Sequence, residues 1–183
     1  AYVHIPWCVR KCPYCDFNSH AAGPELPEDA YVAALLADLR ADLEHVGDRR
    51  LSSIFFGGGT PSLFSAKALA AIVDGLERLV AFSEDIEITL EANPTSAEAN
   101  KFAGFAAAGV NRVSLGVQSL RPGALTFLGR QHDAGQALAA VEMAAKTFPR
   151  HSFDLIYARQ GHQLADWTGE LQMALDLGLD HMS

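Results

Sequence analysis

Tyr2-Val3-His4-Ile5-Pro6-Trp7-Cys8-Val9-Arg10-Lys11-Cys12-Pro13-Tyr14-Cys15 is the most informative stretch of this chain. It begins with a short run that is typical of a β-strand, and it ends with all three cysteines of the sequence, in the spacing Cys-x3-Cys-x2-Cys. Iron–sulfur clusters are held by cysteine thiolates, normally four of them. Three clustered thiolates without a fourth therefore predict a cluster that leaves one iron open to another ligand.

Two simpler interpretations of the cysteines stay open. They could form a Cys3His zinc site with His4 or His20, although structural zinc sites usually draw on two separated ligand pairs. They could also be ordinary buried thiols. A disulfide framework is excluded, because the number of cysteines is odd and the chain is long and cysteine-poor.

The composition is that of a globular protein. Hydrophobic residues make up 49% of the 183 residues, charged residues make up 20%, and the net charge is −8. A phosphate-neutralising surface is not expected, so nucleic acid is a disfavoured partner. There is no apolar run of about 18 residues, which disfavours a transmembrane segment. The redox-sensitive thiols favour the cytoplasm.

Short apolar or β-branched runs alternate with longer segments of helical spacing along the whole length. This order predicts an α/β fold with a parallel sheet and crossover helices. The expected strands are residues 2–5, 53–56, 86–90, 112–115 and 152–156, and residues 179–183 resemble the opening of another strand.

Start and stop signals bound the expected helices. These signals are Pro27 and Gly47 around the first helix, Ser65 before the second, a Thr95–Glu98 capping box and Gly109 around the third, Asp133 before the fourth, and the apolar stripe Trp167, Leu171 and Leu175 before Gly178 in the last.

Polar and glycine-rich residues follow successive strands. In a parallel barrel each strand delivers its following loop to the same mouth, so these residues are expected to meet in one pocket. They are the three cysteines, Gly57-Gly58-Gly59-Thr60, Glu91, Gln118 and Asp154. The glycine run either lets the backbone approach a ligand closely or forms only a tight turn. It lacks the Gly-Lys-Ser/Thr ending of a phosphate loop, which disfavours a nucleotide triphosphatase.

The cysteine loop resembles that of the radical S-adenosylmethionine (radical SAM) superfamily, Cys-x3-Cys-x-aromatic-Cys, with Tyr14 at the aromatic position. The resemblance narrows to the oxygen-independent coproporphyrinogen III oxidase-like family, and within it to the heme chaperone HemW branch. The residues that carry it are 2–8, 15–19, 57–63, 90–94, 111–119 and 153–157.

This resemblance implies a partial parallel (β/α) barrel of about five to six repeats, with residues 1–183 forming the radical SAM core domain of a longer chain. It implies that Cys8, Cys12 and Cys15 hold a 4Fe-4S cluster whose open iron is chelated by S-adenosylmethionine. The residues that would contact S-adenosylmethionine are Tyr2, Tyr14, Gly57, Gly58, Gly59, Thr60, Glu91, Gln118, Arg130 and Asp154. Arg130 would pair with the methionine carboxylate, although an exposed arginine there would be unremarkable.

The resemblance implies a heme chaperone that binds heme and passes it to respiratory heme apoproteins. The alternatives are an oxygen-independent coproporphyrinogen III oxidase, which uses a deoxyadenosyl radical on a porphyrinogen, and a zinc-stabilised structural domain. The oxidising branch has a fourth cysteine two residues after the third, where this chain has Phe17, which favours the chaperone branch. The resemblance also implies an electron-donor protein such as a flavodoxin or ferredoxin. Three interpretations of Arg10 and Lys11 stay open: they bind this donor protein, they offset the charge of the cluster, or they lie on a solvated face of the loop.

The sequence leaves the conformation of two local features undecided. If Tyr2 faces the barrel interior, period-two alternation places His4 there too, near the reactive centre or as a buried histidine bonded to a backbone carbonyl. After the fifth strand the family usually continues with Pro-Gly-Gln, whereas this chain reads Ala158-Arg159-Gln160-Gly161-His162. Loss of the proline removes a fixed φ from that loop.

Overall fold

The computed structural model describes residues 1–178 and 181–183. Its main sheet holds five parallel strands in the spatial order β1 (Tyr2–Ile5), β4 (Leu51–Gly58), β5 (Phe82–Ala92), β6 (Arg112–Gln118) and β7 (Arg150–Leu155). Each expected strand is present, and β4, β5 and β7 begin earlier than the apolar runs predict, whereas β6 begins at the expected residue. The expectation of an α/β fold with a parallel sheet is confirmed.

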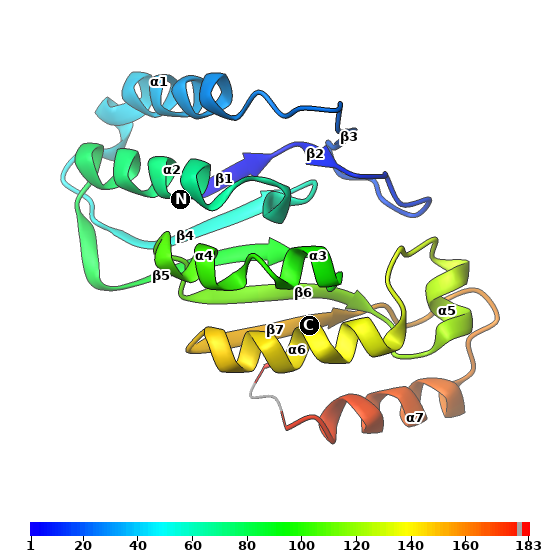
Figure 1. The fold of residues 1–183 in the computed structure, drawn as a ribbon. Helices are drawn as coiled ribbons and strands as arrows, with labels where there is room; N and C mark the ends of the chain where they lie inside the picture. Colours follow the sequence, from blue (N-terminus) through cyan, green and yellow to red (C-terminus); the bar gives the residue numbers. More distant parts are fainter. Residues whose placement is uncertain (179–180) are drawn as a thin grey trace.

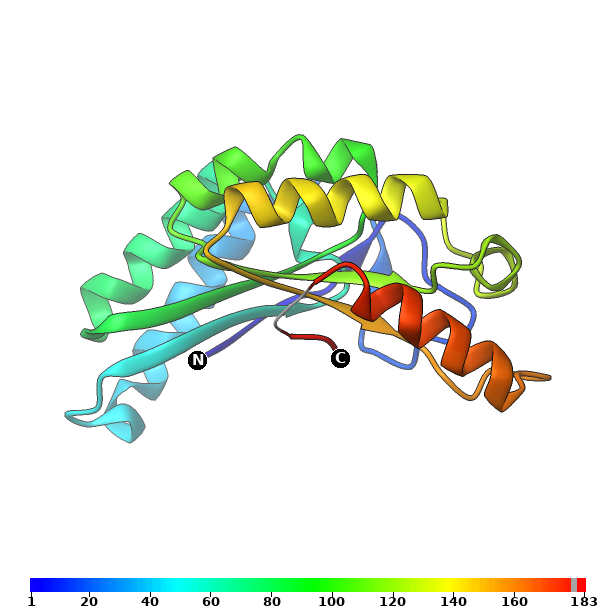
Figure 2. The ribbon, with the colours of Figure 1, turned by 90° about the horizontal axis from the view of Figure 1, so that it is seen from below.

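Helices connect the strands and cover one face of the curved sheet (Figures 1 and 2). Because the strands follow one another in space as they do in the chain, the winding is that of a barrel opened along one side. The helices are α1 (Glu28–Val46), α2 (Ala66–Leu79), α3 (Ser96–Ala99), α4 (Phe102–Ala107), α5 (Pro122–Phe127), α6 (Ala134–Thr147) and α7 (Leu164–Leu175), with a 3-10 turn, η1 (Pro61–Leu63).

Alternation along the strands separates an apolar layer from a polar one. On β6, Val113 and Leu115 are fully buried in the core under the helices. Ser114, between them, faces the other side and bonds Asp154 of β7 at 3.4 Å. Arg112 spans three strands on this inner side, donating to Ser152 at 2.9 Å and to a threonine of β5. The core therefore lies between sheet and helices, and the concave face stays polar.

The chain ends against β7. Met182 bridges Phe153 in parallel, and the Ser183 backbone exchanges hydrogen bonds with Phe153 and Leu155 at 3.0 and 2.8 Å. The expected opening of a further strand is seen as this single bridge at Met182, while Leu179 and Asp180 lie outside the described residues. Within the described part of the chain, no helix is both long and apolar enough to span a bilayer.

Most helix signals are confirmed. The Ser65 hydroxyl accepts from the Ala68 amide, and Asp133 forms a full capping box with Gln136. Gly47 ends α1, and Gly109 has a φ of 98°, which only glycine adopts without strain.

Two helix predictions are wrong. The Thr95 hydroxyl accepts from the Glu98 amide, but the Glu98 carboxylate does not complete the capping box, because it is bonded to the Asn93 amide instead. In α7, Leu175 is 58% exposed, and the helix buries Glu170 and Ala174. The stripe is therefore right at Trp167, which packs against the core, and wrong at Leu175. It omits Glu170 because a buried carboxylate carries no apolar signal.

Ala158, in the loop after β7, has a φ of 55°. Non-glycine residues pay a steric cost in this left-handed region. We expect Ala158→Gly to raise the free energy of unfolding by roughly 0.5–1 kcal/mol, measured by urea denaturation. Ala34→Gly, on the exposed side of α1, is the matched control and should lower it by roughly 0.5–1 kcal/mol. A loss of stability in both variants would contradict the strain at Ala158.

Candidate functional site

The cysteine loop is anchored at both ends. Strand β2 (Trp7–Cys8) pairs in parallel with β3 (His20–Ala21), and two further backbone bonds of 2.7 Å join Pro6 to His20 and Cys8 to Ala22. Inside the loop the Cys15 amide bonds the Cys12 carbonyl at 3.0 Å, which forms a turn between these cysteines. All three thiols are free, with Cys8 buried and the other two half-buried.

One pocket at the carboxyl ends of the strands collects most of the predicted site residues. Its lining includes Cys8, Cys12, Tyr14, Cys15, Gly59, Thr60, Glu91, Gln118, Arg130 and Asp154. Tyr2, Gly57 and Gly58 are not among the lining residues. The expected convergence of residues that follow successive strands is therefore seen for eight of the ten residues named for it, all except Gly57 and Gly58.

The glycine run packs against β1 and the chain after it. A Cβ on Gly58 would lie 2.7 Å from the His4 ring, and one on Gly59 would lie 2.6 Å from the Trp7 carbonyl oxygen. Gly58 also has a φ of 115°. A Cβ on Gly57 would meet the side chains of Tyr2, Phe55 and Glu91 within 3.2 Å. Only Gly59 lines the pocket, so close packing by neighbouring side chains, rather than contact with a ligand, explains the missing side chains at Gly57 and Gly58.

Tyr2 and His4 share the inner side of β1, as alternation predicts. The Tyr2 hydroxyl lies 3.1 Å from His4 Nδ1, and His4 Nε2 lies 2.9 Å from the Asn18 carbonyl oxygen. Because a carbonyl only accepts, Nε2 carries the proton, and in the neutral ring Nδ1 accepts from Tyr2. The interpretation of His4 as a histidine bonded to a backbone carbonyl is confirmed, and this bond ties β1 to the end of the cysteine loop.

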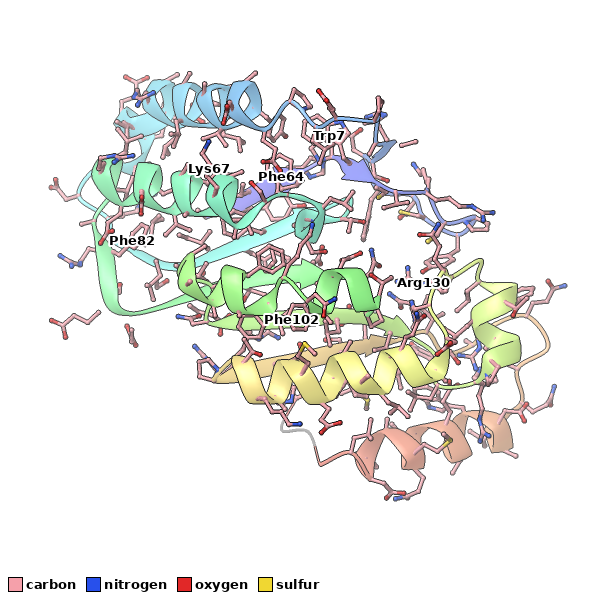
Figure 3. The ribbon with its side chains drawn as sticks, in the orientation of Figure 1. Trp7, Phe64, Lys67, Phe82, Phe102 and Arg130 are labelled. Atoms are coloured by element: carbon pink, nitrogen blue, oxygen red, sulfur yellow. The ribbon has the colours of Figure 1, made fainter. Side chains whose placement is uncertain are left out.

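Arg130 connects the cysteine loop to the rest of the pocket (Figure 3). Its guanidinium donates to Cys12 Sγ at 3.4 Å, to Tyr14 Oη at 3.3 Å, to Asn93 Oδ1 at 2.6 Å and to the Gly116 carbonyl at 2.8 Å. Its Nε is buried without a partner. The interpretation as an unremarkable exposed arginine is wrong, because this side chain is fixed inside the pocket with one donor unused.

Two carboxyl groups face the pocket near each other. The pKa of Glu91 is raised from 4.5 to about 7, mainly by burial and to a smaller extent by the negative charge of Asp154. A hydrogen bond from the Gly58 backbone amide acts in the opposite direction and lowers this pKa. Burial also raises the pKa of Asp154, although the Ser114 hydroxyl and nearby Arg112 oppose the shift. Such a pair favours a ligand that brings a cation or several hydroxyl donors, because either one lowers the cost of ionising both groups.

Gln118 occupies a strained backbone position. It ends β6 at a bulge in the pairing with β7, and its φ is 67°. Strained non-glycine residues of this kind cluster at functional sites, where surrounding structure holds them. The positive φ of Gln118 turns the chain at the edge of the pocket, and Gln118 lines the pocket.

Sequence reasoning did not connect several residues with the pocket that they help to build. Asn93 accepts from Arg130 and donates to the Thr60 hydroxyl at 3.3 Å. Glu98 holds the Asn93 amide at 2.8 Å, and burial raises the pKa of this carboxyl above its usual value. His132 lines the pocket and bonds the Val117 carbonyl at 3.0 Å. Asn93 could have been found from the sequence, because it is a polar residue directly after a strand. Glu98 and His132 lie on other segments and carry no such signal.

The donor set fits an iron–sulfur cluster. Three free thiols line one pocket beside Arg130, whose positive charge compensates thiolate charge. Among the residues that the structure describes, no three His, Cys, Asp or Glu side chains form a group suited to one metal ion. The geometry thus gives no support to a zinc site on His4 or His20. A cubane cluster needs no such group, because each thiolate binds a different iron.

A family comparison agrees with this geometry. The family model of the Radical SAM superfamily matches residues 2–173. The chain belongs to this superfamily. The resemblance seen in the cysteine loop is therefore confirmed, and the superfamily implies a 4Fe-4S cluster and S-adenosylmethionine as cofactors.

Relatives are similar over the whole chain. It is 45% identical to the heme chaperone HemW of Haemophilus influenzae and 44% identical to that of Escherichia coli, covering 49% and 48% of those proteins. It is 42% identical to the mitochondrial radical S-adenosyl methionine domain-containing protein 1 of Bos taurus. The chain thus spans about half the length of the curated relatives it matches.

A solved structure supports the partial barrel. Coproporphyrinogen III oxidase (HemN) from Escherichia coli, described as a radical SAM enzyme, superposes with a TM-score of 0.87 at 27% identity. The match covers all of this chain and 42% of that one. The expected partial parallel barrel of radical SAM type is confirmed.

The raised pKa of Glu91 gives a test of the pocket electrostatics. Because its folded-state pKa of about 7 exceeds the ordinary 4.5, the folded protein should lose stability as the pH rises between these values. Glu91→Gln removes this loss, so it should stabilise the protein by about 1–2 kcal/mol more at high pH than at low pH, allowing for solvent screening. Urea denaturation of reduced protein under anaerobic conditions measures the difference. Glu84→Gln, which changes an exposed carboxyl, is the control, and equal pH profiles for the two variants would contradict the assignment.

Proposed function

We propose that the protein acts as a heme chaperone built on a radical SAM core, binding heme and transferring it to respiratory apoproteins. The observation that carries this proposal is the 45% identity, over the whole chain, to a protein named heme chaperone HemW. Phe17 supports it, because the oxidising branch has a fourth cysteine at this position. The Phe17 side chain is 58% exposed and lines the pocket mouth, where an apolar ring suits a planar porphyrin.

In the proposed site, Cys8, Cys12 and Cys15 hold the 4Fe-4S cluster. S-adenosylmethionine would occupy the adjoining pocket, with contacts to Tyr14, Gly59, Thr60, Gln118 and Arg130, and with Tyr2, Gly57 and Gly58 behind them. When bound, the reduced cluster supplies the electron that cleaves the sulfonium. An electron donor such as a flavodoxin or ferredoxin would dock near the cysteine loop. Because thiols that bind a cluster need a reducing compartment, we propose a cytoplasmic location.

The charged pocket residues would each bind a different part of S-adenosylmethionine. The unused Arg130 Nε suits the methionine carboxylate, because a buried donor without a partner gains most from an anion. Glu91 suits the methionine ammonium, whose charge would lower the cost of ionising this carboxyl. Asp154, which accepts from Ser114, suits the ribose hydroxyls.

Gln118 allows backbone and side-chain effects to be separated. Gln118→Gly relieves the positive φ, so the free energy of unfolding should stay equal or rise, while the affinity for S-adenosylmethionine should fall about tenfold through loss of the side-chain hydrogen bonds. Gln118→Ala keeps the strain and should lose affinity without the gain in stability. Calorimetric titration of cluster-loaded protein measures the affinity. Wild-type affinity in both variants would exclude Gln118 from the site.

The second candidate, coproporphyrinogen III oxidase, is favoured by the structural match to HemN. An anaerobic assay distinguishes the two functions. The full-length protein with reconstituted cluster, dithionite and S-adenosylmethionine should retain stoichiometric heme and should release no protoporphyrinogen from coproporphyrinogen III. Turnover of the porphyrinogen would reject the chaperone function.

Iron and sulfide analysis with electron paramagnetic resonance, before and after S-adenosylmethionine is added, tests the proposed cofactors. Cys12→Ala should abolish the paramagnetic signal of the cluster.

A further inference from the structure

A buried carboxylate on α7 holds the loop that follows β6. Glu170 is fully buried and accepts from the Ser119 hydroxyl, from the Leu120 amide at 2.8 Å and from Arg159 at 2.6 Å. Burial alone would raise the pKa of Glu170, but the hydrogen bonds from Ser119, Arg159 and Leu120 and the charge of Arg159 lower it below its usual value. Glu170 is therefore an ionised group with its acceptors satisfied.

Arg159 holds the second loop. Its side chain is 7% exposed, and it donates to the Ile156 carbonyl at 2.7 Å while it pairs with Glu170. The second guanidinium nitrogen also lies 3.0 Å from His162 Nε2, which accepts from it. Arg159 thus joins the chain after β7 to helix α7, in the segment where the family usually has Pro-Gly-Gln.

The two loops carry pocket residues. Ser119 and Leu120 directly follow Gln118, whose φ is 67°. The Gln118 carbonyl accepts from the Ile156 amide at 2.9 Å, and Ile156 lies two residues after Asp154. The backbone of Gln118 is therefore restrained on one side through Glu170 and on the other through Arg159. Neither charged residue lines the pocket itself.

We propose that Arg159 and Glu170 are positioning residues, which hold Gln118 in its left-handed conformation and fix the edge of the cofactor pocket. The proposal rests on the proposed binding of S-adenosylmethionine. A buried ion pair is weak evidence for stability as such, because neutral residues of similar volume often stabilise a fold as well. The ion pair has a different advantage here, since a planar guanidinium and a carboxylate can bond several backbone and side-chain groups of two loops at once.

The test removes the charges without leaving one of them unpaired. In the double variant Arg159→Met with Glu170→Gln, the glutamine oxygen still accepts from Ser119 and Leu120, but the link to Ile156 is lost. Lys146→Met with Glu142→Gln removes an exposed ion pair on α6 and is the matched control. Full-length, cluster-loaded protein is compared for cluster content, for the dissociation constant of S-adenosylmethionine and for amide hydrogen exchange at Leu120 and Ile156.

We expect the double variant to keep its cluster and its cooperative unfolding and to bind S-adenosylmethionine about tenfold more weakly. The Ile156 amide should exchange faster because its link to Arg159 is lost, and the Leu120 amide should exchange faster because a neutral amide oxygen is a weaker acceptor than a carboxylate. The control variant should match the parent in all three. Parental affinity and exchange in the double variant would overturn the proposal. If the parent itself binds no S-adenosylmethionine, the proposed cofactor role fails, and amide exchange alone decides the positioning role.

Arg159→Lys provides a second variant that keeps the charge. A lysine ammonium is a single point donor and cannot bond Ile156 and Glu170 in the same planar geometry. We expect intermediate affinity and intermediate exchange at Ile156, with exchange at Leu120 unchanged because Glu170 is retained. If the double variant does not fold, this variant decides, and parental values for both its affinity and its Ile156 exchange would overturn the proposal.

Discussion

The close approach of the end of β4 to β1 and to Trp7 is the contact on which the site depends. It requires residues without side chains, since a Cβ at Gly59 would fall 2.6 Å from the Trp7 carbonyl. Backbone bonds of 2.7 Å from Gly59 to Ile5 and from Thr60 to Trp7 hold the two segments together. The cysteine loop starts directly after Trp7, so this packing sets where the thiols lie relative to the other loops.

The pocket is built around buried polar groups that bond to other segments of the chain, and among them only the Arg130 Nε is buried without a partner in the described part of the chain. Glu98 fastens the Asn93 turn, Glu170 fastens the loop after Gln118, and Arg130 joins the cysteine loop to β6. Burying such groups costs free energy unless every partner is present. The consequence is a pocket whose loops cannot move independently, which suits a site that must keep a cofactor and a cluster in fixed relation.

The structure also explains an irregularity of the sequence. The loop after β7 lacks the proline that would restrict its backbone, and Ala158 adopts a positive φ in its place. Arg159 then supplies restraint by hydrogen bonds to Ile156 and Glu170. The ion pair of Arg159 with Glu170 thus connects this loop to α7.

The sequence by itself determined the alternation of strands and helices, the parallel sheet, most helix caps and the grouping of the cysteines with Glu91, Gln118 and Asp154. The reason is that strand and helix patterns are local and periodic, and parallel strands deliver their following loops to one edge. The sequence also identified the family through the spacing of the cysteines. Only the tertiary structure decided that neighbouring side chains leave no room for a Cβ at Gly57 and Gly58, that Arg130 lies fixed inside the pocket and that α7 buries Glu170 rather than Leu175. The physical reason is that a polar side chain is buried only when partners from distant segments satisfy it, and a local pattern does not contain those partners.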